Sequence, residues 1–262
     1  MLLAKDGIFP ITRDSTGRLK PHLPASGFHF PGTIQGEGKL CGVPSLFIRL
    51  AGCNLHCQWR TKDGNISSCD TAYASFRLEG TQSATVEEIC QTLMHNRAHI
   101  RHVVITGGEP FLQAMELRAL CRQVKEELHF HVTVESNATL FDPEAAQYID
   151  LFSLSPKLPS SQAGKQVLHP ATIQQFIDIA RDKGKDFQLK FVYSCEQDIA
   201  DIENLLKQLR HWQNEDVLLM PLGGNWEDMR LHCLKTLEHC IQKGWRYCDR
   251  LHLSLFGEKA GV

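Results

Sequence analysis

Short apolar segments and amphipathic segments alternate along the sequence from about residue 45 to the end. Val103-Val104-Ile105 is a β-branched run typical of a strand buried on both faces, and Gly107-Gly108 ends it. Residues 172–183 carry apolar side chains at helical spacing, and Gly184 follows as a C-cap. This alternation predicts an α/β fold: a partial, incomplete TIM-like barrel of alternating parallel strands and helices.

The same patterns give the expected elements by residue range. The predicted strands are 45–50, 102–106, 130–135, 149–154, 188–193, 217–220 and 250–256. The predicted helices are 85–95, 113–128, 172–183, 197–212 and 227–243. Residues 1–27 are rich in Pro, Gly and charge and show no clear periodicity. We therefore expect them to be a poorly ordered or peripheral extension, followed by one domain over residues 28–262.

Composition narrows the class of protein. The formal net charge of −2 gives no general electrostatic reason to bind nucleic acid or a membrane surface. No uninterrupted apolar stretch approaches the roughly 20 residues of a membrane-spanning helix. Lys5 and Asp6 stand where a signal peptide needs its apolar run. These features predict a cytoplasmic protein.

Three of the ten cysteines lie close together in the sequence, on a segment that follows the predicted strand ending at Leu50. They are Cys53, Cys57 and Cys69. Because the cytosol keeps thiols reduced, clustered cysteines indicate metal ligands or catalytic groups rather than disulfides. Three thiolates can hold a four-iron cluster and leave one iron without a protein ligand. The spacing alone leaves open a structural zinc site with His56 as fourth ligand, and also a chance arrangement.

The remaining cysteines are expected to be structural, because buried free cysteine behaves as a small apolar residue. They are Cys41, Cys90, Cys121, Cys195, Cys233, Cys240 and Cys248.

The spacing of Cys53, Cys57 and Cys69 resembles the Cys-x3-Cys-x2-Cys signature of the radical S-adenosylmethionine superfamily. Eleven residues separate Cys57 from Cys69 where that signature usually has two, so residues 60–68 are interpreted as a loop insertion. The segment 106–110, Thr-Gly-Gly-Glu-Pro, resembles the superfamily segment that binds the amino group of S-adenosylmethionine.

One family within this superfamily, 7-carboxy-7-deazaguanine synthase, is similar from about residue 28 to the C-terminus. The matching segments are Ile34-Gln-Gly-Glu-Gly38, Phe47-Ile-Arg-Leu-Ala-Gly-Cys53, Cys69-Asp-Thr71, Thr106-Gly-Gly-Glu-Pro110, Ser155-Pro-Lys157, Leu189-Lys-Phe191, Leu219-Met-Pro221 and Arg250-Leu-His252. The resemblance implies a lyase that contracts the ring of 6-carboxy-5,6,7,8-tetrahydropterin to 7-carboxy-7-deazaguanine with loss of ammonia.

The resemblance also implies roles for matched residues. Substrate contacts are expected from Ile34, Gln35, Gly36, Glu37, Arg49, Thr106, His252 and Val262. Arg49 should grip the substrate carboxylate, since a guanidinium fork suits a planar carboxylate. From the residue alone, an internal salt bridge would equally satisfy Arg49, and a lone strand histidine such as His252 is more often structural.

Contacts to S-adenosylmethionine are expected from Ser68, Asp70, Gly108, Glu109, Ser155, Pro156 and Lys157. Glu135 and Asn137 are expected to line the same cofactor, although a strand end with a turn would also explain them. Thr71 matches a magnesium ligand, which requires substrate oxygens to complete the site.

The resemblance further implies a 4Fe-4S cluster held by Cys53, Cys57 and Cys69, an external flavodoxin-like one-electron donor and a homodimer. Two alternatives stay open. One is another radical S-adenosylmethionine enzyme, such as a glycyl-radical activase. The other is a zinc-stabilised binding module without catalysis.

Overall fold

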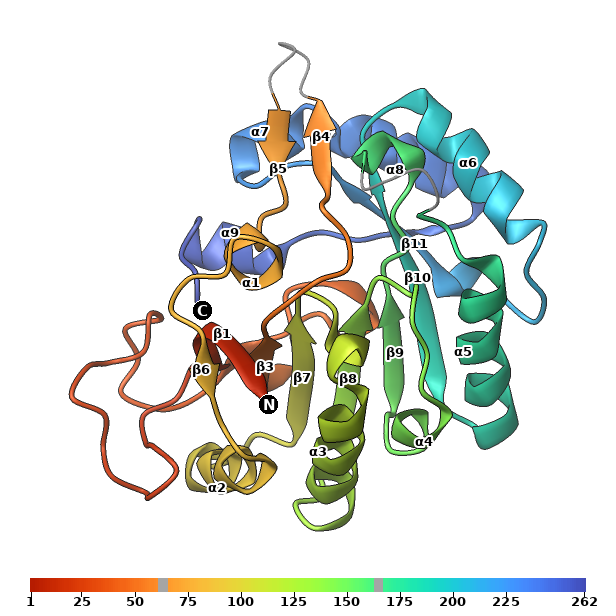
Figure 1. Cartoon of the computed structure of the whole chain (residues 1–262). Coiled ribbons are helices and arrows are strands. Elements are labelled where there is room, and N and C mark those ends of the chain that lie inside the picture. The colour runs from red at the N-terminus through yellow and green to blue at the C-terminus, as the bar shows by residue number, and fades with distance from the viewer. Residues whose placement is uncertain (61–65, 163–166) are drawn as a thin grey trace.

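The computed structural model describes residues 1–60, 66–162 and 167–262, and one large open sheet dominates it (Figure 1). Within these residues the sheet has ten strands, in the order β12-β11-β10-β9-β8-β7-β3-β1-β6, with β2 paired to β3. The parallel strands are β3 (Pro44–Leu50), β7 (His102–Gly107), β8 (His131–Ser136), β9 (Leu151–Leu154), β10 (Asp186–Tyr193), β11 (Val217–Pro221) and β12 (Arg246–Tyr247). The sheet ends at β6 and β12 without closing, so the predicted partial barrel is confirmed.

The N-terminal residues differ from the expectation of a peripheral extension. Strand β1 (Leu2–Phe9) lies inside the sheet, antiparallel to β3 and to β6 (Gln82–Ser83). The register shifts between Leu3 and Ile8, and Gly7 has a φ of 56° at that irregularity. The charged residues and the glycine hide the strand pattern, because the bulge they accompany breaks the alternation of period two. The short β2 (Thr33–Ile34) adds to the other part of β3.

Five long helices overlap the predicted ones: α2 (Val86–Asn96), α3 (Ala114–Glu126), α5 (Pro170–Lys183), α6 (Glu196–Leu206) and α8 (Cys233–Lys243). Short helical segments are α1 (Ala72–Ser75), α4 (Pro143–Ala146), α7 (Trp226–Arg230) and α9 (Leu251–Phe256), with 3-10 turns η1 (Gly38–Leu40), η2 (Pro110–Gln113), η3 (Pro159–Ser161) and η4 (Asn214–Asp216). A capping box of Thr85 and Glu88 starts α2, and Gly184 ends α5 with a φ of 62°.

Three helix and strand predictions need correction. The predicted helix 227–243 is two helices, α7 and α8, and the predicted helix 197–212 ends at Leu206. The predicted strand 250–256 is wrong, because this segment forms α9. Its alternation of apolar and polar residues fits a strand, but its first amide, on Leu251, donates to the Gly36 carbonyl at 2.9 Å instead of to a neighbouring strand.

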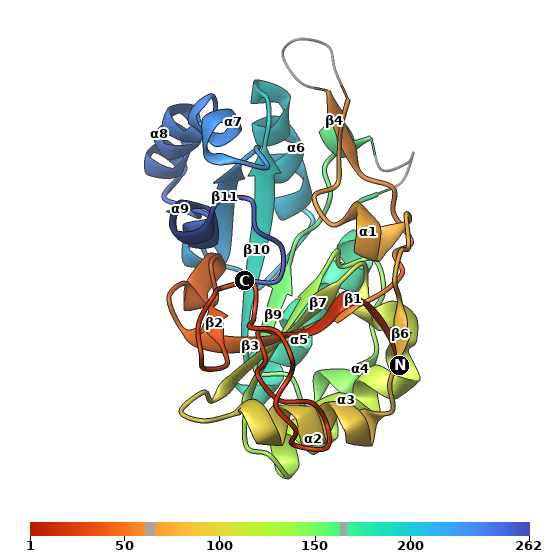
Figure 2. The same cartoon turned by 90° about the vertical axis from the view of Figure 1, so that its left-hand side faces the viewer.

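The predicted insertion at residues 60–68 overlaps a hairpin of β4 (Gln58–Arg60) and β5 (Ile66–Ser68), while residues 61–65 lie outside the described residues. The hairpin extends beyond the carboxyl ends of the parallel strands in both views (Figure 1, Figure 2). Its Trp59 side chain is buried against Leu55, Cys57 and Val167. The hairpin therefore packs against the cysteine loop through an apolar contact of Trp59.

The two faces of the sheet have opposite character. On the face toward the helices lie fully buried phenylalanines, among them Phe152 and Phe187. On the other face the strands present polar side chains that line a cavity, including Arg49, Thr106 and Lys190. A closed barrel would fill this interior with packed apolar layers; here it is left for a site.

The expectation of structural, buried cysteines holds for Cys90, Cys121, Cys240 and Cys248. It is wrong for Cys41 and Cys195, which are exposed, and Cys233 is intermediate. None of the described helices is both long and apolar enough to span a bilayer.

Candidate active site

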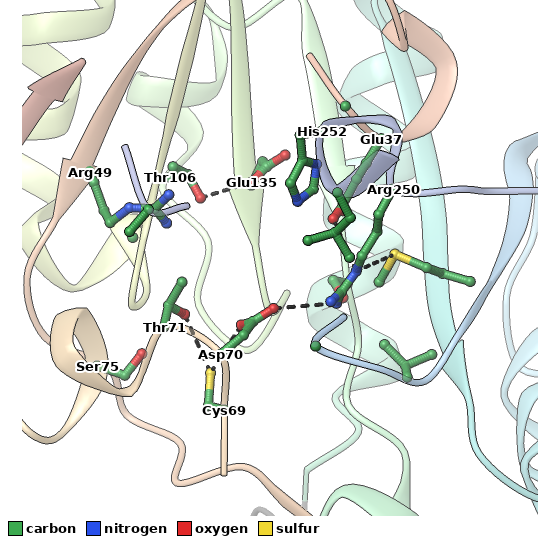
Figure 3. Close-up of a pocket in the computed structure, with 18 of the residues that line it drawn as sticks. Glu37, Arg49, Cys69, Asp70, Thr71, Ser75, Thr106, Glu135, Arg250 and His252 are labelled. Atoms are coloured by element: carbon green, nitrogen blue, oxygen red, sulfur yellow. Dashed lines mark hydrogen bonds and ion pairs between the residues drawn. The ribbon is translucent and has the colours of Figure 1, made fainter. Parts of the chain in front are cut away.

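A cavity of about 570 Å³ lies at the carboxyl ends of the parallel strands. The loops after these strands supply its wall: Cys53 after β3, Gly108 after β7, Asn137 after β8 and Ser155 after β9. Carboxyl ends of parallel strands meet at one edge, which explains how residues far apart in sequence converge. Figure 3 shows Arg49 and Thr71 on one side of the pocket and Glu37 and Arg250 on the other.

The three loop cysteines all line this cavity. The loop is anchored by backbone hydrogen bonds: Cys53 N donates to Ser75 O at 3.0 Å, and Cys69 N donates to Cys57 O at 3.0 Å. Burial raises the pKa of Cys57 to about 11, so this thiol keeps its proton at neutral pH unless a metal displaces it. Among the described residues, no group of three or more His, Cys, Asp or Glu side chains is arranged to hold a metal ion in this structure.

The donor set nevertheless fits an iron–sulfur cluster, because three thiols face one cavity and lie next to buried apolar groups. Leu55 and Trp59 pack with Cys57, and Cys53 and Cys69 border the same apolar cluster. Thiolates are the usual ligands of such clusters. The Asn137 amide lies 3.8 Å from Cys53 Sγ, close enough to influence the sulfur.

Glu109 lies behind the cavity wall. Its fully buried carboxylate accepts hydrogen bonds from the backbone N–H groups of Phe111 and Asn137, at 3.1 and 2.7 Å. It also accepts from the Ser136 hydroxyl at 2.9 Å. Burial raises its pKa to about 7, against the lowering effect of these donors. Glu109 therefore joins the turn after β7 to the turn after β8.

A second set of polar groups lies on the inner sheet face. Strand register places Arg49 beside Thr106, and Glu135 beside Ser153. The Glu135 carboxylate accepts from Thr106 Oγ1 at 2.8 Å and from Gln35 Nε2 at 3.1 Å. These side chains form one hydrogen-bonded row along the cavity.

Charged side chains link the turn before β3 to the cysteine loop. Lys190 Nζ forms an ion pair with Glu37, and Arg250 Nε lies 3.4 Å from Glu37 Oε1. Arg250 Nη2 lies 3.3 Å from Asp70 Oδ2, beside Cys69 (Figure 3). Burial opposes ionisation of Glu37, but Lys190 and Arg250 hold its pKa well below the usual range.

His252 lies on α9 rather than on a strand and packs against the backbone of Gly36. A Cβ atom at Gly36 would come within 2.3 Å of His252 Nδ1, so only glycine allows this approach. Burial lowers the pKa of His252, which favours the neutral imidazole.

Comparison with known proteins shows which family the chain belongs to. A family model described as "4Fe-4S single cluster domain" matches residues 34–154. The 7-carboxy-7-deazaguanine synthase of Rhodopirellula baltica is 35% identical over 87% of this chain and 85% of its own length. The synthase of Halobacterium salinarum is 33% identical over 93% of this chain and 94% of its own. This chain belongs to the 7-carboxy-7-deazaguanine synthase family.

Structural comparison agrees with membership of the synthase family. The crystal structure of QueE from Escherichia coli superposes with a TM-score of 0.61 at 26% identity, over 94% of this chain and 95% of that one. Streptococcus suis SuiB, at 14% identity and a TM-score of 0.51, shares the fold over 78% of this chain and 48% of its own. The predicted family, fold and enzyme class are thus confirmed, and the activase and zinc-module alternatives are set aside.

The structure brings nearly all of the predicted site residues to one cavity. The predicted residues that line it are Ile34, Gln35, Gly36, Glu37, Arg49, Cys53, Cys57, Ser68, Cys69, Asp70, Thr71, Thr106, Gly108, Glu135, Asn137, Ser155, Lys157, His252 and Val262. Glu109 and Pro156 are buried and do not line it. Glu135, expected to line the cofactor, is hydrogen-bonded to Gln35 and Thr106 at the wall of this cavity.

Sequence reasoning missed several synthase residues that shape this cavity, namely Phe9, Trp59, Tyr73, Lys190 and Arg250. Lys190 and Arg250 stand inside matched segments but received no role. A charged residue within an apolar strand, as in Leu189-Lys-Phe191, was the available signal, because such a charge requires a partner.

Proposed function

We propose that the chain converts 6-carboxy-5,6,7,8-tetrahydropterin to 7-carboxy-7-deazaguanine and ammonia by radical S-adenosylmethionine chemistry. The observation that carries this proposal is the shared cavity: the thiols of Cys53, Cys57 and Cys69 and the guanidinium of Arg49 all line it. The same cavity would therefore hold S-adenosylmethionine at the cluster and, beside it, a substrate whose carboxylate meets a cation.

The three cysteines would hold a 4Fe-4S cluster, and neighbouring loops would hold S-adenosylmethionine. When bound, the cluster and S-adenosylmethionine supply the hydrogen-abstracting radical chemistry. Gly108, Asn137 and the Ser155–Lys157 pair offer backbone and polar contacts beside the thiols; Lys157 Nζ donates to Ser155 Oγ at 2.8 Å. Ser68 and Asp70 complete this end of the cavity.

The other end of the cavity would bind the pterin. Glu135 supplies acceptor oxygens for ring N–H groups, and Gln35 and Thr106 already donate to its carboxylate and fix its orientation. Arg49 would receive the substrate carboxylate. Ile34, Gly36, His252 and Val262 would enclose the ring, while Glu37 stays engaged with Lys190.

Magnesium would bind near Thr71. Thr71 Oγ1 lies 3.3 Å from Cys69 Sγ, so this hydroxyl lies where the cluster loop meets the cavity. Magnesium prefers oxygen ligands and keeps substrate or water oxygens in its coordination shell. Substrate oxygens would complete this site.

We further propose a cytoplasmic homodimer that receives electrons from a flavodoxin-like donor. We also propose that the chain forms one domain, with an insertion in the cluster loop at residues 60–68. The strand β1 supports counting the first residues with that unit.

The test is anaerobic reconstitution followed by incubation with the carboxypterin, S-adenosylmethionine, magnesium and a reductant. We expect ring-contracted product, detected by mass spectrometry. The appearance of 5′-deoxyadenosine without ring-contracted product would contradict the proposed substrate.

Single replacements Cys53→Ala, Cys57→Ala and Cys69→Ala should abolish turnover and lower bound iron, because each removes a cluster ligand. Cys233→Ala is the matched control, since this residue lies on α8 outside the cavity wall. A ligand variant that kept a full cluster and normal turnover would refute that assignment.

A further inference from the structure

Behind Arg49 lies a carboxylate that none of the recognised sequence motifs contains. Asp6, on strand β1, accepts a hydrogen bond at Oδ2 from Arg49 Nε at 2.8 Å. The same oxygen accepts from Tyr73 Oη, also at 2.8 Å. Both members of the ion pair are largely buried, with 15% of the Arg49 side chain and 11% of the Asp6 side chain exposed. A strand that was expected to be peripheral thus supplies a partner to a cavity residue.

Aromatic rings confine the same guanidinium. Its central carbon lies 5.1 Å from the centre of the Phe9 ring and 6.0 Å from the centre of the Tyr73 ring. Phe9 in turn stacks on Phe47, with ring centres 5.3 Å apart. Cation–π contact holds the guanidinium plane against these rings, so its orientation is restricted by more than one group.

The hydrogen bonds found for Arg49 among the described residues use Nε alone. Its side chain lines the cavity, so the two terminal NH2 groups are left for a ligand. A guanidinium held through Nε still presents its end-on pair of NH2 groups, and this pair matches the spacing of a carboxylate.

The arrangement is a poor device for stability alone. Asp6 Oδ1 is buried and has no hydrogen-bond partner among the described residues. A buried ion pair with an unsatisfied oxygen contributes little net stability, because desolvation offsets the attraction. Orienting Arg49 gives the pair a role that stability alone does not.

We propose that Asp6 and Tyr73 are positioning residues that hold Arg49 with its terminal NH2 groups toward the cavity, ready for the pterin carboxylate. This inference rests on the proposed function. It assigns the substrate's carboxylate specificity to an N-terminal strand and a short helix that act through Arg49.

The experiment measures equilibrium binding of two pterins to the reconstituted enzyme with S-adenosylmethionine present and no reductant. One ligand carries the 6-carboxylate and the other a neutral 6-carboxamide of the same size. Wild-type enzyme should prefer the carboxylate. Asp6→Ala should weaken carboxylate binding roughly 10-fold and leave carboxamide binding nearly unchanged.

Tyr73→Phe removes only a hydroxyl and guards against misfolding of the first variant. It should weaken carboxylate binding by roughly 3-fold in the same selective way. The matched control is Asp182→Ala, an exposed acid on α5 outside the cavity, which should leave both affinities unchanged. Iron content is measured for every variant.

Selective loss of carboxylate binding supports the positioning role. Equal weakening of both pterins, or no change in Asp6→Ala and Tyr73→Phe, would overturn it, as would a wild-type enzyme without preference. A wild-type enzyme that prefers the carboxylate but never forms ring-contracted product would instead contradict the proposed reaction.

Discussion

Gly36 occupies a position where any side chain would collide with His252. A Cβ atom at Gly36 would lie 3.0 Å from His252 Cγ and 3.1 Å from its Cβ, so a simple ring rotation cannot relieve the contact. The Gly36 carbonyl also accepts from the first amide of α9, which ties the turn to that helix. Packing therefore explains why the first glycine of the Gln35-Gly-Glu-Gly38 segment, Gly36, is a glycine.

Gly36→Ala should lower the free energy of unfolding by about 1–3 kcal/mol, because the added methyl overpacks the contact with α9. Chemical denaturation of the cluster-free protein measures this. The loss should be smaller when alanine also replaces His252, since the two nearest contacts, with ring atoms at 2.3 and 3.0 Å, are then removed. Gly224→Ala meets nothing within 4 Å and serves as the control. An equal loss in both backgrounds would contradict the collision.

Glu109 predicts a pH dependence of stability. Its pKa is about 7 in the folded protein and starts from 4.5 when unperturbed. Between these values the unfolded chain has lost its proton while the folded protein keeps it, so stability falls as pH rises from about 4.5 to 7. Above that range both states are ionised and the effect is constant.

Replacing Glu109 with Gln removes this dependence. The difference in unfolding free energy between wild type and Glu109→Gln should change by on the order of 3 kcal/mol between pH 4 and pH 8. Denaturation curves across that range measure it. A difference independent of pH would show that Glu109 ionises normally.

At the scale of single residues, the sequence was a good guide wherever chemistry requires a residue type. The three cysteines and Arg49 could be predicted because thiolate and guanidinium chemistry limits the choice, and Thr106 could be predicted because it lies in a segment that resembles the family's. Asp6 and Tyr73 could not, because their importance depends on which strand lies beside β3. Such pairing is a property of the folded chain.

At the scale of elements, the β4–β5 hairpin shows how the insertion is connected to the cluster loop. Trp59 is 9% exposed and shares an apolar cluster with Cys57. This burial shields the loop from water on that side.

Trp59→Ala should leave a cavity beside Cys57 and loosen the loop that carries the cysteines. We expect less iron and sulfide after anaerobic reconstitution and faster loss of the cluster in air. Trp226→Ala is the control, because this tryptophan is 47% exposed on α7. Unchanged iron content and air stability in Trp59→Ala would mean that the hairpin does not support the loop.

Predictions of elements succeeded where periodicity was strong and failed where tertiary contacts decided. Helix α5 and strand β7 follow from their spacing and their glycines. The α9 segment alternates like a strand, yet it folds as a helix against Gly36. The β1 strand was missed because a bulge interrupts its pattern.

At the scale of the whole molecule, buried charges join distant parts of the chain across the cavity. The Glu37–Lys190 pair connects the turn before β3 to β10, and Arg250 extends the connection to the loop of Asp70. The Lys190 side chain is only 6% exposed.

Lys190→Met should destabilise the protein by about 3–5 kcal/mol, because Glu37 then lacks its closest buried counter-charge. The double variant with Glu37→Leu should recover most of this loss, since neither charge remains. Chemical denaturation gives both values, and pterin binding should be weak in both variants. Additive losses would show that the two charges are independent.

An open sheet with a charged interior has a consequence for laboratory evolution. Buried ion pairs often stabilise the folded state less than apolar residues of similar size do. A screen for heat resistance alone would therefore enrich apolar substitutions at Glu37 and Lys190. Such variants would resist heat better, but apolar side chains would replace the charged groups of the active-site cavity. Selection schemes for this enzyme should therefore couple thermal survival to turnover.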